Sequence, residues 1–128
     1  MEKSADQIAN SQQIKLTIGL KIFTLTLLEN KTVTAFKKKL PLEIYLIELN
    51  ANEKYAQLNE SLPVDASIPK KIQVGDLKLF GDHTIVLFYK SFSTSYAYTD
   101  IGFIEESNDL QDALGGGNIM VRFELLNN

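Results

Sequence analysis

Residues 14–28 read IKLTIGLKIFTLTLL, and this stretch carries the clearest evidence for the fold class. Its apolar residues first fall on even positions and then, from Phe23, on odd positions. A period of two is typical of a strand with one buried face, because successive side chains of a strand point to opposite sides. The change of phase predicts a turn, for which Gly19 supplies the backbone freedom. We therefore predict a β-hairpin with strands over 14–19 and 22–28.

One clear helix is predicted after this hairpin, over residues 31–39. Asn30 is a typical N-cap residue, because its side chain can accept a hydrogen bond from an N–H group that the first turn leaves unpaired. Val33 and Phe36 follow at helical spacing. Lysines occupy the last turn, where positive charge suits the helix dipole, and Pro41 marks the end.

Short apolar segments separated by turn signals make up the rest of the chain. This pattern is typical of a small barrel or sandwich, and we prefer a barrel because closure removes exposed strand edges. The predicted fold class is all-β: a closed β-barrel of about eight strands with one covering α-helix. A turn or bulge is expected at Gly75. The further strands are expected over 42–49, 84–92, 96–105 and 119–125.

Three other segments carry less regular patterns. Residues 53–58 are expected to form one helical turn or an irregular segment. Residues 60–70 contain two prolines and are expected to be a loop or a short edge strand. Residues 108–114 are predicted as a short helix, which the glycines at 115–117 end.

The composition suits one folded domain. The chain has 128 residues, of which 45% are hydrophobic and 23% charged, and it contains no cysteine. A chain of this size can bury enough surface to fold without a metal or a disulfide. Residues 1–13 are polar and are predicted to form a flexible arm ahead of a single barrel domain over 14–128. The net charge of −3 argues against a nucleic-acid-binding protein, which normally has a basic face.

Targeting signals are not evident in the sequence. No stretch is long and apolar enough to span a membrane as a helix, and residues 1–13 lack the apolar region of a signal peptide. A cytoplasmic location is therefore expected, with export as the alternative if a signal segment precedes this sequence.

Few side chains offer catalytic or metal-binding chemistry. His83 is the only histidine, which excludes a multi-histidine metal site and leaves a serine triad unsupported. It is expected to be a solvated turn residue beside Asp82. The glycines at 115–117 precede a strand rather than a helix, unlike those of a phosphate-binding loop. We predict no catalytic residue, no metal site and no cofactor.

The candidate ligand site combines tyrosines with a carboxylate and a hydroxyl. Tyr96 and Tyr98 share one face of the strand predicted over 96–105, which follows a Ser/Thr-rich loop. Tyrosine joins apolar area to one polar group, which suits a binding surface. Packing of the same rings inside the barrel is the alternative. The predicted ligand-binding residues are Glu53, Tyr55, Tyr96, Tyr98 and Thr99.

A series of short motifs runs along the chain. They are Leu40-Pro41-Leu42, Glu53-Lys54-Tyr55-x-x-Leu58, Gly75-Asp76-Leu77, Phe88-Tyr89 and Ser95-Tyr96-x-Tyr98-Thr99-x-Ile101-Gly102-x-Ile104. In order and spacing this series resembles the small bacterial cyclophilin-like domain family, over about 14–126. The resemblance implies a closed barrel of about eight strands with less helix than a true cyclophilin.

The resemblance also bears on function. True cyclophilins are peptidyl-prolyl isomerases that use an arginine beside an apolar proline pocket, but their Phe-His-Arg and Gln-Gly-Gly-Asp signatures are absent from this sequence. The only arginine is Arg122, and Asp100 and Phe103 stand where a basic residue is expected in the family. The expected function is a non-catalytic or weakly catalytic domain that binds an extended peptide or a small ligand. The alternatives are a peptidyl-prolyl isomerase and a structural or self-associating module.

Overall fold

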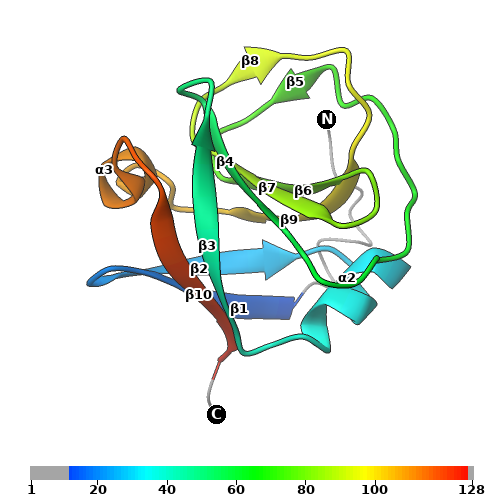
Figure 1. The fold of residues 1–128 in the computed structure, drawn as a ribbon, viewed down its shortest axis with the longest axis horizontal. Coiled ribbons are helices and arrows are strands. Elements are labelled where there is room, and N and C mark those ends of the chain that lie inside the picture. The colour runs from blue at the N-terminus through cyan, green and yellow to red at the C-terminus, as the bar shows by residue number, and fades with distance from the viewer. Residues whose placement is uncertain (1–11, 127–128) are drawn as a thin grey trace.

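The computed structural model of the chain describes residues 12–126. Eight antiparallel strands close into a barrel (Figure 1), which confirms the predicted fold class. Around the barrel, each strand pairs with the next one, and the last strand pairs with the first. The order is β1 (Gln12–Ile18), β10 (Ile119–Leu125), β3 (Leu42–Leu49), β4 (Glu53–Gln57), β7 (Thr84–Phe88), β6 (Asp76–Phe80), β9 (Thr99–Ile104) and β2 (Lys21–Leu27).

The first hairpin forms where the period-two pattern places it. β1 and β2 are joined by Gly19 and Leu20, and Gly19 has a φ of 60°, which glycine adopts without steric cost. Leu20 stands at the tip of the turn and is exposed. Of the arm predicted over 1–13, Gln12 and Gln13 belong to β1, and the rest lies outside the described residues.

The helix α2 (Lys31–Lys37) packs its apolar side against the barrel core. The side chain of Asn30 accepts a hydrogen bond from the Val33 N–H at 2.8 Å, which confirms the predicted N-cap. The Asn30 amide also donates to the carbonyl oxygen of Asp100 at 3.0 Å and so ties the start of the helix to β9. Phe36 is fully buried. The helix is therefore fixed at its first turn by the cap and at its last by packing.

The segment 53–58, predicted as a helical turn or irregular, is instead mostly the regular strand β4. It pairs with β3 on one side and with β7 on the other. The inward-facing residues of β4 are Lys54 and Ala56, both of which are buried. Because one of these inward residues is a lysine, the alternation of apolar and polar residues that marks a strand is absent from this segment of the sequence.

Two other strands are shorter than predicted. The strand predicted over 84–92 ends at Phe88, where the chain leaves the barrel. The strand predicted over 96–105 begins only at Thr99. The residues between these points belong to a separate layer outside the barrel, which the sequence pattern does not reveal. The helix predicted over 108–114 is α3 (Leu110–Leu114).

Apolar side chains fill the barrel interior, as expected for eight strands. Phe36 and Phe123 meet edge to face, with ring centroids 5.6 Å apart and planes at 80°. Leu125 shares its phase with Val121 and Phe123 but is 47% exposed, because it ends the strand. The nine positions predicted for the core from strand periodicity and helical spacing are all buried. These positions are Leu16, Ile18, Phe23, Leu25, Phe36, Leu79, Leu87, Val121 and Phe123.

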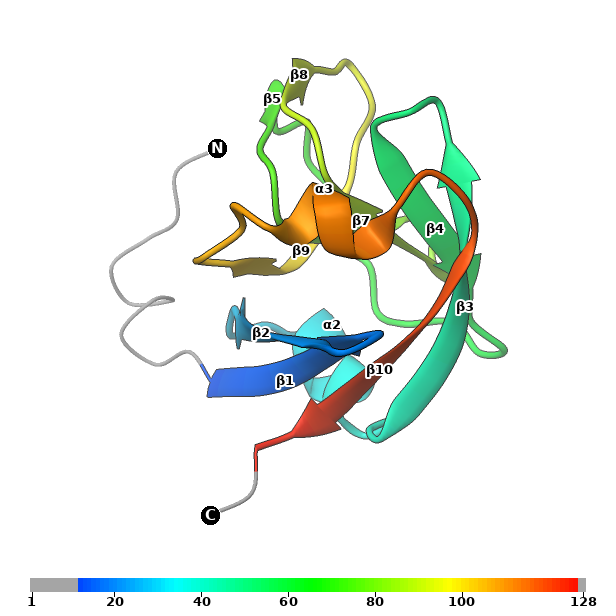
Figure 2. The same ribbon diagram turned by 90° about the vertical axis from the view of Figure 1, so that its left-hand side faces the viewer.

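A second, smaller hydrophobic cluster lies on the outer face of the barrel. β5 (Lys71–Ile72) and β8 (Phe92–Ser93) form a two-stranded sheet that both Figure 1 and Figure 2 show apart from the barrel strands. Beneath it β7 turns Val86 outward, whereas Ile85 and Leu87 belong to the inner core. This explains why β7 is apolar on both faces. The cluster consists of Ile72, Val86, Phe88 and Tyr98, with Tyr55 and Phe92 packed against it.

The structure contains no helix within residues 12–126 that is long and apolar enough to cross a membrane.

Packing of the inner core predicts the effect of truncating Phe123. Phe123→Ala is expected to lower the free energy of unfolding by about 3–5 kcal/mol, because the variant loses the transfer energy of the ring and keeps a cavity. Met120→Ala on the same strand is the control, since Met120 is 49% exposed, and its loss is expected to stay below about 1 kcal/mol. Urea denaturation measures both values. A loss under about 1 kcal/mol for Phe123→Ala would contradict the packing of β10.

Candidate functional site

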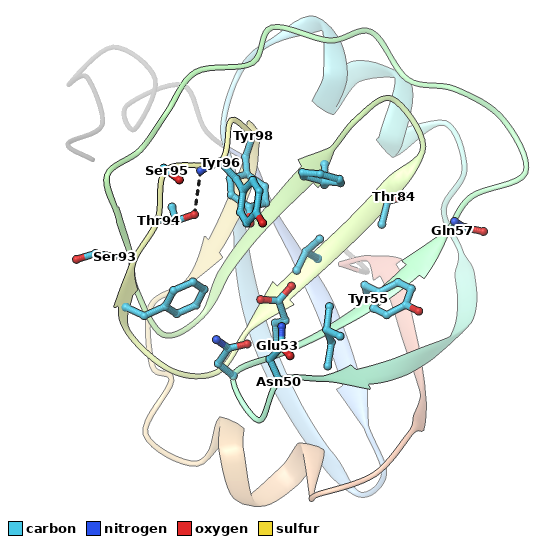
Figure 3. A pocket seen from close by; sticks show the side chains of 15 residues that line it. Asn50, Glu53, Tyr55, Gln57, Thr84, Ser93, Thr94, Ser95, Tyr96 and Tyr98 are labelled. Carbon is cyan, nitrogen blue, oxygen red and sulfur yellow. Dashed lines mark hydrogen bonds between the residues drawn. The ribbon is translucent and has the colours of Figure 1, made fainter.

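A pocket of about 610 Å³ opens on the outer face of the barrel, beside the second cluster (Figure 3). We call it the outer groove. Outward-facing residues of β4, β7 and β6 form its floor, and the β3–β4 turn and residues 92–98 form its walls. Five aromatic residues contribute to its lining: Tyr55, Phe80, Phe92, Tyr96 and Tyr98.

The structure brings Glu53, Tyr55, Tyr96 and Tyr98 together in this groove, although the sequence predicts them on separate grounds. Figure 3 shows Tyr55 to the right of the Glu53 carboxylate and the rings of Tyr96 and Tyr98 above it. Thr99 does not join them. It is buried at the start of β9, and its hydroxyl oxygen accepts a hydrogen bond from the Asp65 N–H at 3.0 Å.

Tyr96 and Tyr98 reach the groove from a loop, and not from one face of a strand as the sequence predicts. Both precede β9. Tyr98 and Ser67 exchange two backbone hydrogen bonds of 2.9 and 3.0 Å, and the Tyr98 side chain is buried. Tyr96 is 64% exposed, and its N–H donates to the Thr94 hydroxyl oxygen at 3.1 Å. The loop therefore anchors one ring and presents the other.

Phe80 joins these two tyrosines and was not identified from the sequence. Its ring centroid lies 6.1 Å from that of Tyr96, at 85°, and 5.7 Å from that of Tyr98. Phe80 ends β6 and is 45% exposed. A signal was present, because Leu77 and Leu79 face inward and Phe80 must then point outward. Phe80 therefore adds exposed aromatic surface to the outer groove.

The turn between β3 and β4 sets the position of Glu53. Asn50 and Ala51 have φ values of 58° and 56°, in the left-handed region. Asparagine tolerates this conformation, whereas alanine adopts it at a cost. The Ala51 N–H donates to Glu48 Oε2 at 2.8 Å, which compensates by holding the turn in place. Glu48, which does not line the groove, therefore holds the turn that forms this wall of the groove.

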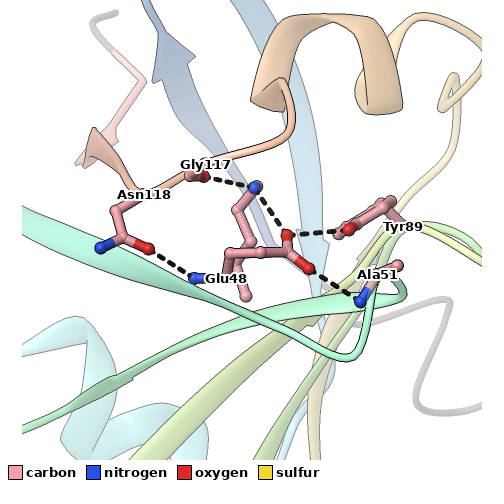
Figure 4. A network of polar contacts seen from close by, with 6 residues as sticks. Glu48, Ala51, Tyr89, Gly117 and Asn118 are labelled. Atoms are coloured by element: carbon pink, nitrogen blue, oxygen red, sulfur yellow. Dashed lines mark hydrogen bonds and ion pairs between the residues drawn. The ribbon is translucent and has the colours of Figure 1, made fainter.

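A buried lysine extends this anchor (Figure 4). Lys54 is fully buried, and its Nζ donates to Glu48 Oε1 at 2.9 Å and to the Gly117 carbonyl oxygen at 2.6 Å. The Tyr89 hydroxyl donates to the same Glu48 oxygen at 2.8 Å, and the Lys54 Nζ lies 5.3 Å from the centre of the Tyr89 ring. Three separate segments thus meet at one ammonium group.

This network changes the acidity of two of its members. Burial pushes the pKa of Glu48 upward, but hydrogen bonds from Lys54, Tyr89 and Ala51 outweigh it and hold the pKa below its usual value. Burial, together with the hydrogen bond to Glu48, raises the pKa of Tyr89 to about 12. Glu48 is therefore the charged partner of Lys54 at neutral pH.

Among the residues that the structure describes, Glu53 is the only charged one in the lining of the outer groove. Within residues 12–126 its carboxylate has neither an ion pair nor a hydrogen-bond partner. Burial raises the pKa of Glu53, and the nearby charge of Glu48 raises it further. The pKa of Tyr98 is also raised, first by burial and then by the charge of Glu53. The groove therefore has negative potential.

The lysine on the outer face of β6 contacts two carboxylates that do not line the groove. Lys78 projects from the same outer face as Val86, but it is buried and contacts Asp100 at 2.6 Å and Asp76 at 4.0 Å. Neither Arg122 nor His83 lines the groove.

The single histidine and arginine make surface contacts instead. His83 Nδ1 lies 2.8 Å from Asp82 Oδ1 in the turn before β7, as the sequence predicts for a solvated turn residue. Arg122 contacts Glu124 and Glu43. The structure also shows no group of three or more His, Cys, Asp or Glu side chains that could hold a metal ion, within the part of the chain it describes.

Comparisons with known proteins support the fold. The sequence model of the Cyclophilin-like family matches residues 16–124. Among solved structures, the chain is similar to a hypothetical protein from Archaeoglobus fulgidus, determined in solution. The TM-score is 0.61, the identity is 18%, and the alignment covers 91% of this chain and 95% of the other. This second likeness shows the fold alone. A search of curated proteins gives no match.

The unpartnered state of Glu53 has a consequence for stability. A raised pKa means that the folded state disfavours the charged form, so the charge of Glu53 lowers stability at neutral pH, and this loss disappears as the pH falls below the unfolded value. Glu53→Gln is therefore expected to unfold at the same or a higher temperature than the wild type at neutral pH, with the difference absent near about pH 4.

Glu48→Gln is the matched control for this measurement. The pKa of Glu48 is lowered, so its charge contributes stability at neutral pH that is lost as the pH falls through its folded pKa. This variant is expected to unfold at a lower temperature than the wild type. Thermal unfolding followed by circular dichroism compares the two. A marked loss of stability in Glu53→Gln at neutral pH would show that its carboxylate has a partner in the folded chain.

Proposed function

The chain belongs to the Cyclophilin-like family, and on that premise we propose that it is a non-catalytic binding domain that takes an extended peptide or a small ligand in the outer groove. The observation that carries this proposal is the lining of the groove. Five aromatic side chains and several hydroxyl and amide groups surround a volume of about 610 Å³, within the usual range for ligand sites. Aromatic rings bury apolar surface, and their polar neighbours orient the ligand.

The shape of the groove favours an extended segment. Its floor follows the paired strands β4 and β7, with Tyr55 opposite Val86 and Gln57 opposite Thr84. Apolar and polar groups therefore alternate along the floor. In an extended peptide, the side chains that face the floor are also two residues apart. Successive ones therefore meet polar and apolar positions of the floor in turn.

Catalysis of prolyl isomerisation is not part of this proposal. The reaction needs a donor placed at the prolyl amide beside an apolar pocket, and the groove lining contains no arginine, histidine or lysine. The groove lining offers aromatic surface without a cationic donor.

A self-associating module is the second candidate, and one observation favours it. Tyr45, Ile47 and Met120 are exposed apolar residues on the outer face of β3 and β10, where Tyr45 pairs with Met120. Large apolar side chains that gather on one face often mark a contact with another protein. We prefer the groove because it is concave and combines apolar with polar groups.

Binding in the outer groove predicts a selective effect of Tyr96. Blocked, unstructured pentapeptides of varied sequence, followed by heteronuclear NMR, are expected to shift backbone amides in residues 49–57 and 92–98. Tyr96→Ala is expected to weaken this binding about tenfold, because exposed aromatic anchors carry much of the energy of such contacts. Tyr45→Ala removes a ring of similar exposure outside the groove and is expected to bind as the wild type does.

Two results would contradict this prediction. One is the absence of any shift at millimolar peptide. The other is a set of shifts centred on β3 and β10 that Tyr45→Ala abolishes, which would favour the self-associating module.

Isomerase activity is expected to be absent. In a coupled assay on a prolyl peptide, the chain should leave the uncatalysed rate unchanged, because Arg122 and His83 lie outside the groove and its lining supplies no cationic donor. Arg122→Ala and His83→Ala are therefore expected to behave as the wild type. A robust rate that survives both substitutions would contradict this explanation.

A further inference from the structure

We propose that the outer groove selects a positively charged side chain of an extended peptide, and that it holds the cationic group of a lysine or an arginine between the Glu53 carboxylate and the surrounding aromatic rings. This inference rests on the proposed function, because it names the chemical class of ligand for the same groove. Three observations support it.

The first observation is that Glu53 stands apart from the other carboxylates. Among the described residues, every other Asp or Glu that is not exposed contacts a cation of the protein. Glu48 contacts Lys54, Asp76 and Asp100 contact Lys78, and Glu124 contacts Lys15 and Arg122. Only Glu53 combines partial burial with the absence of a partner. Since leaving a carboxylate in this state costs free energy, a cation from outside the chain is its natural partner.

The second observation is that the protein already contains such a cation site. The ammonium group of Lys54 is held by the Glu48 carboxylate, by the Gly117 carbonyl oxygen and by the Tyr89 ring at 5.3 Å. A ring within about 6 Å of a cation attracts it through the negative potential of its face. The Lys54 site shows how this chain binds an ammonium group: with one carboxylate, a neutral oxygen and tyrosine.

The outer groove repeats the carboxylate and the tyrosine of this site around open space. Glu53 supplies the carboxylate, and Tyr55 and Tyr96 supply rings that line the same groove, beside and above it in Figure 3. Ammonium and guanidinium groups carry several donors and no acceptor, which suits the unpartnered carboxylate of Glu53.

The third observation concerns ligands of the opposite charge. Among residues 12–126 the groove lining contains no lysine, arginine or histidine, and Lys78, on the same outer face of the barrel, contacts Asp76 and Asp100. An acidic peptide or a phosphate would therefore meet an uncompensated negative charge. A wholly neutral peptide would leave Glu53 desolvated without a partner, so it binds less tightly than a cationic one.

The affinity should also depend on pH in one direction. The charge of Glu48 raises the pKa of Glu53, and the charge of Glu53 raises the pKa of Tyr89 and of Tyr98. The other titratable groups of the groove are Tyr55 and Tyr96. Acidification therefore neutralises Glu53 before Glu48, because the pKa of Glu53 is raised above the usual glutamate value while that of Glu48 is lowered.

The test compares three blocked pentapeptides that differ only at the central residue: lysine, arginine or norleucine, each between glycine pairs. Norleucine is an apolar, unbranched side chain close to that of lysine in length, without its charge. Titration calorimetry and NMR are expected to show that the lysine and arginine peptides bind the wild type about tenfold more tightly than the norleucine peptide. Glu53→Gln is expected to remove this preference, and Glu106→Gln, which removes one exposed carboxylate elsewhere, to retain it.

The outcomes separate the inference from the proposed function. Equal affinity for all three peptides would overturn the cation preference and leave peptide binding intact, whereas no binding of any peptide would overturn both. Butylammonium chloride is the further arm: binding as tight as that of the lysine peptide would overturn the peptide as the source of the cation. The preference of the wild type for the lysine peptide should also disappear on acidification. If Glu53→Gln keeps the preference, the proposed role of the Glu53 carboxylate is wrong.

Discussion

Closure of the barrel determines where this protein can place a binding site. Eight strands enclose an interior that their own side chains fill, and Phe36 and Phe123 complete this packing with an edge-to-face contact. No ligand can then enter the barrel, and the strands offer no long free edge to a partner. A binding site must therefore be built on the outside, and the chain does so by laying β5, β8 and the loop before β9 over the outer face of β7.

Buried charges hold the barrel strands beneath this layer, and the β3–β4 turn beside it, in place. Lys54 joins the β3–β4 turn to the segment before β10 through Glu48 and Gly117, while Lys78 joins β6 to β9 through Asp100. Such pairs contribute little net stability but fix one arrangement, because any displacement leaves a charge without its partner. Glu53 departs from this rule in the same region, because its carboxylate contacts no cation of the described residues.

Local patterns in the sequence anticipate the elements that are built from local rules. The alternation in residues 14–28 predicts the first hairpin, and the side chain of Asn30 predicts the start of α2. Prediction fails at β4, because the side chain of Lys54 points inward there. Its charge is satisfied by the Gly117 carbonyl oxygen and the Glu48 carboxylate, and a local sequence pattern does not reveal these contacts. Prediction also fails around Tyr96 and Tyr98, where the conformation is set by pairing with Ser67, far away in sequence.

The all-β class, most strand positions, the inner core and the residue types of the candidate site follow from the sequence without any structure. Periodicity carries this information, because burial on one face of a strand repeats every two residues. The folded chain was needed to show that Glu53, Tyr55, Tyr96 and Tyr98 share one groove, that Phe80 joins them and that Thr99 does not. These facts depend on which strands become neighbours when the barrel closes, and on a loop that crosses its outer face, and neither leaves a local pattern in the sequence.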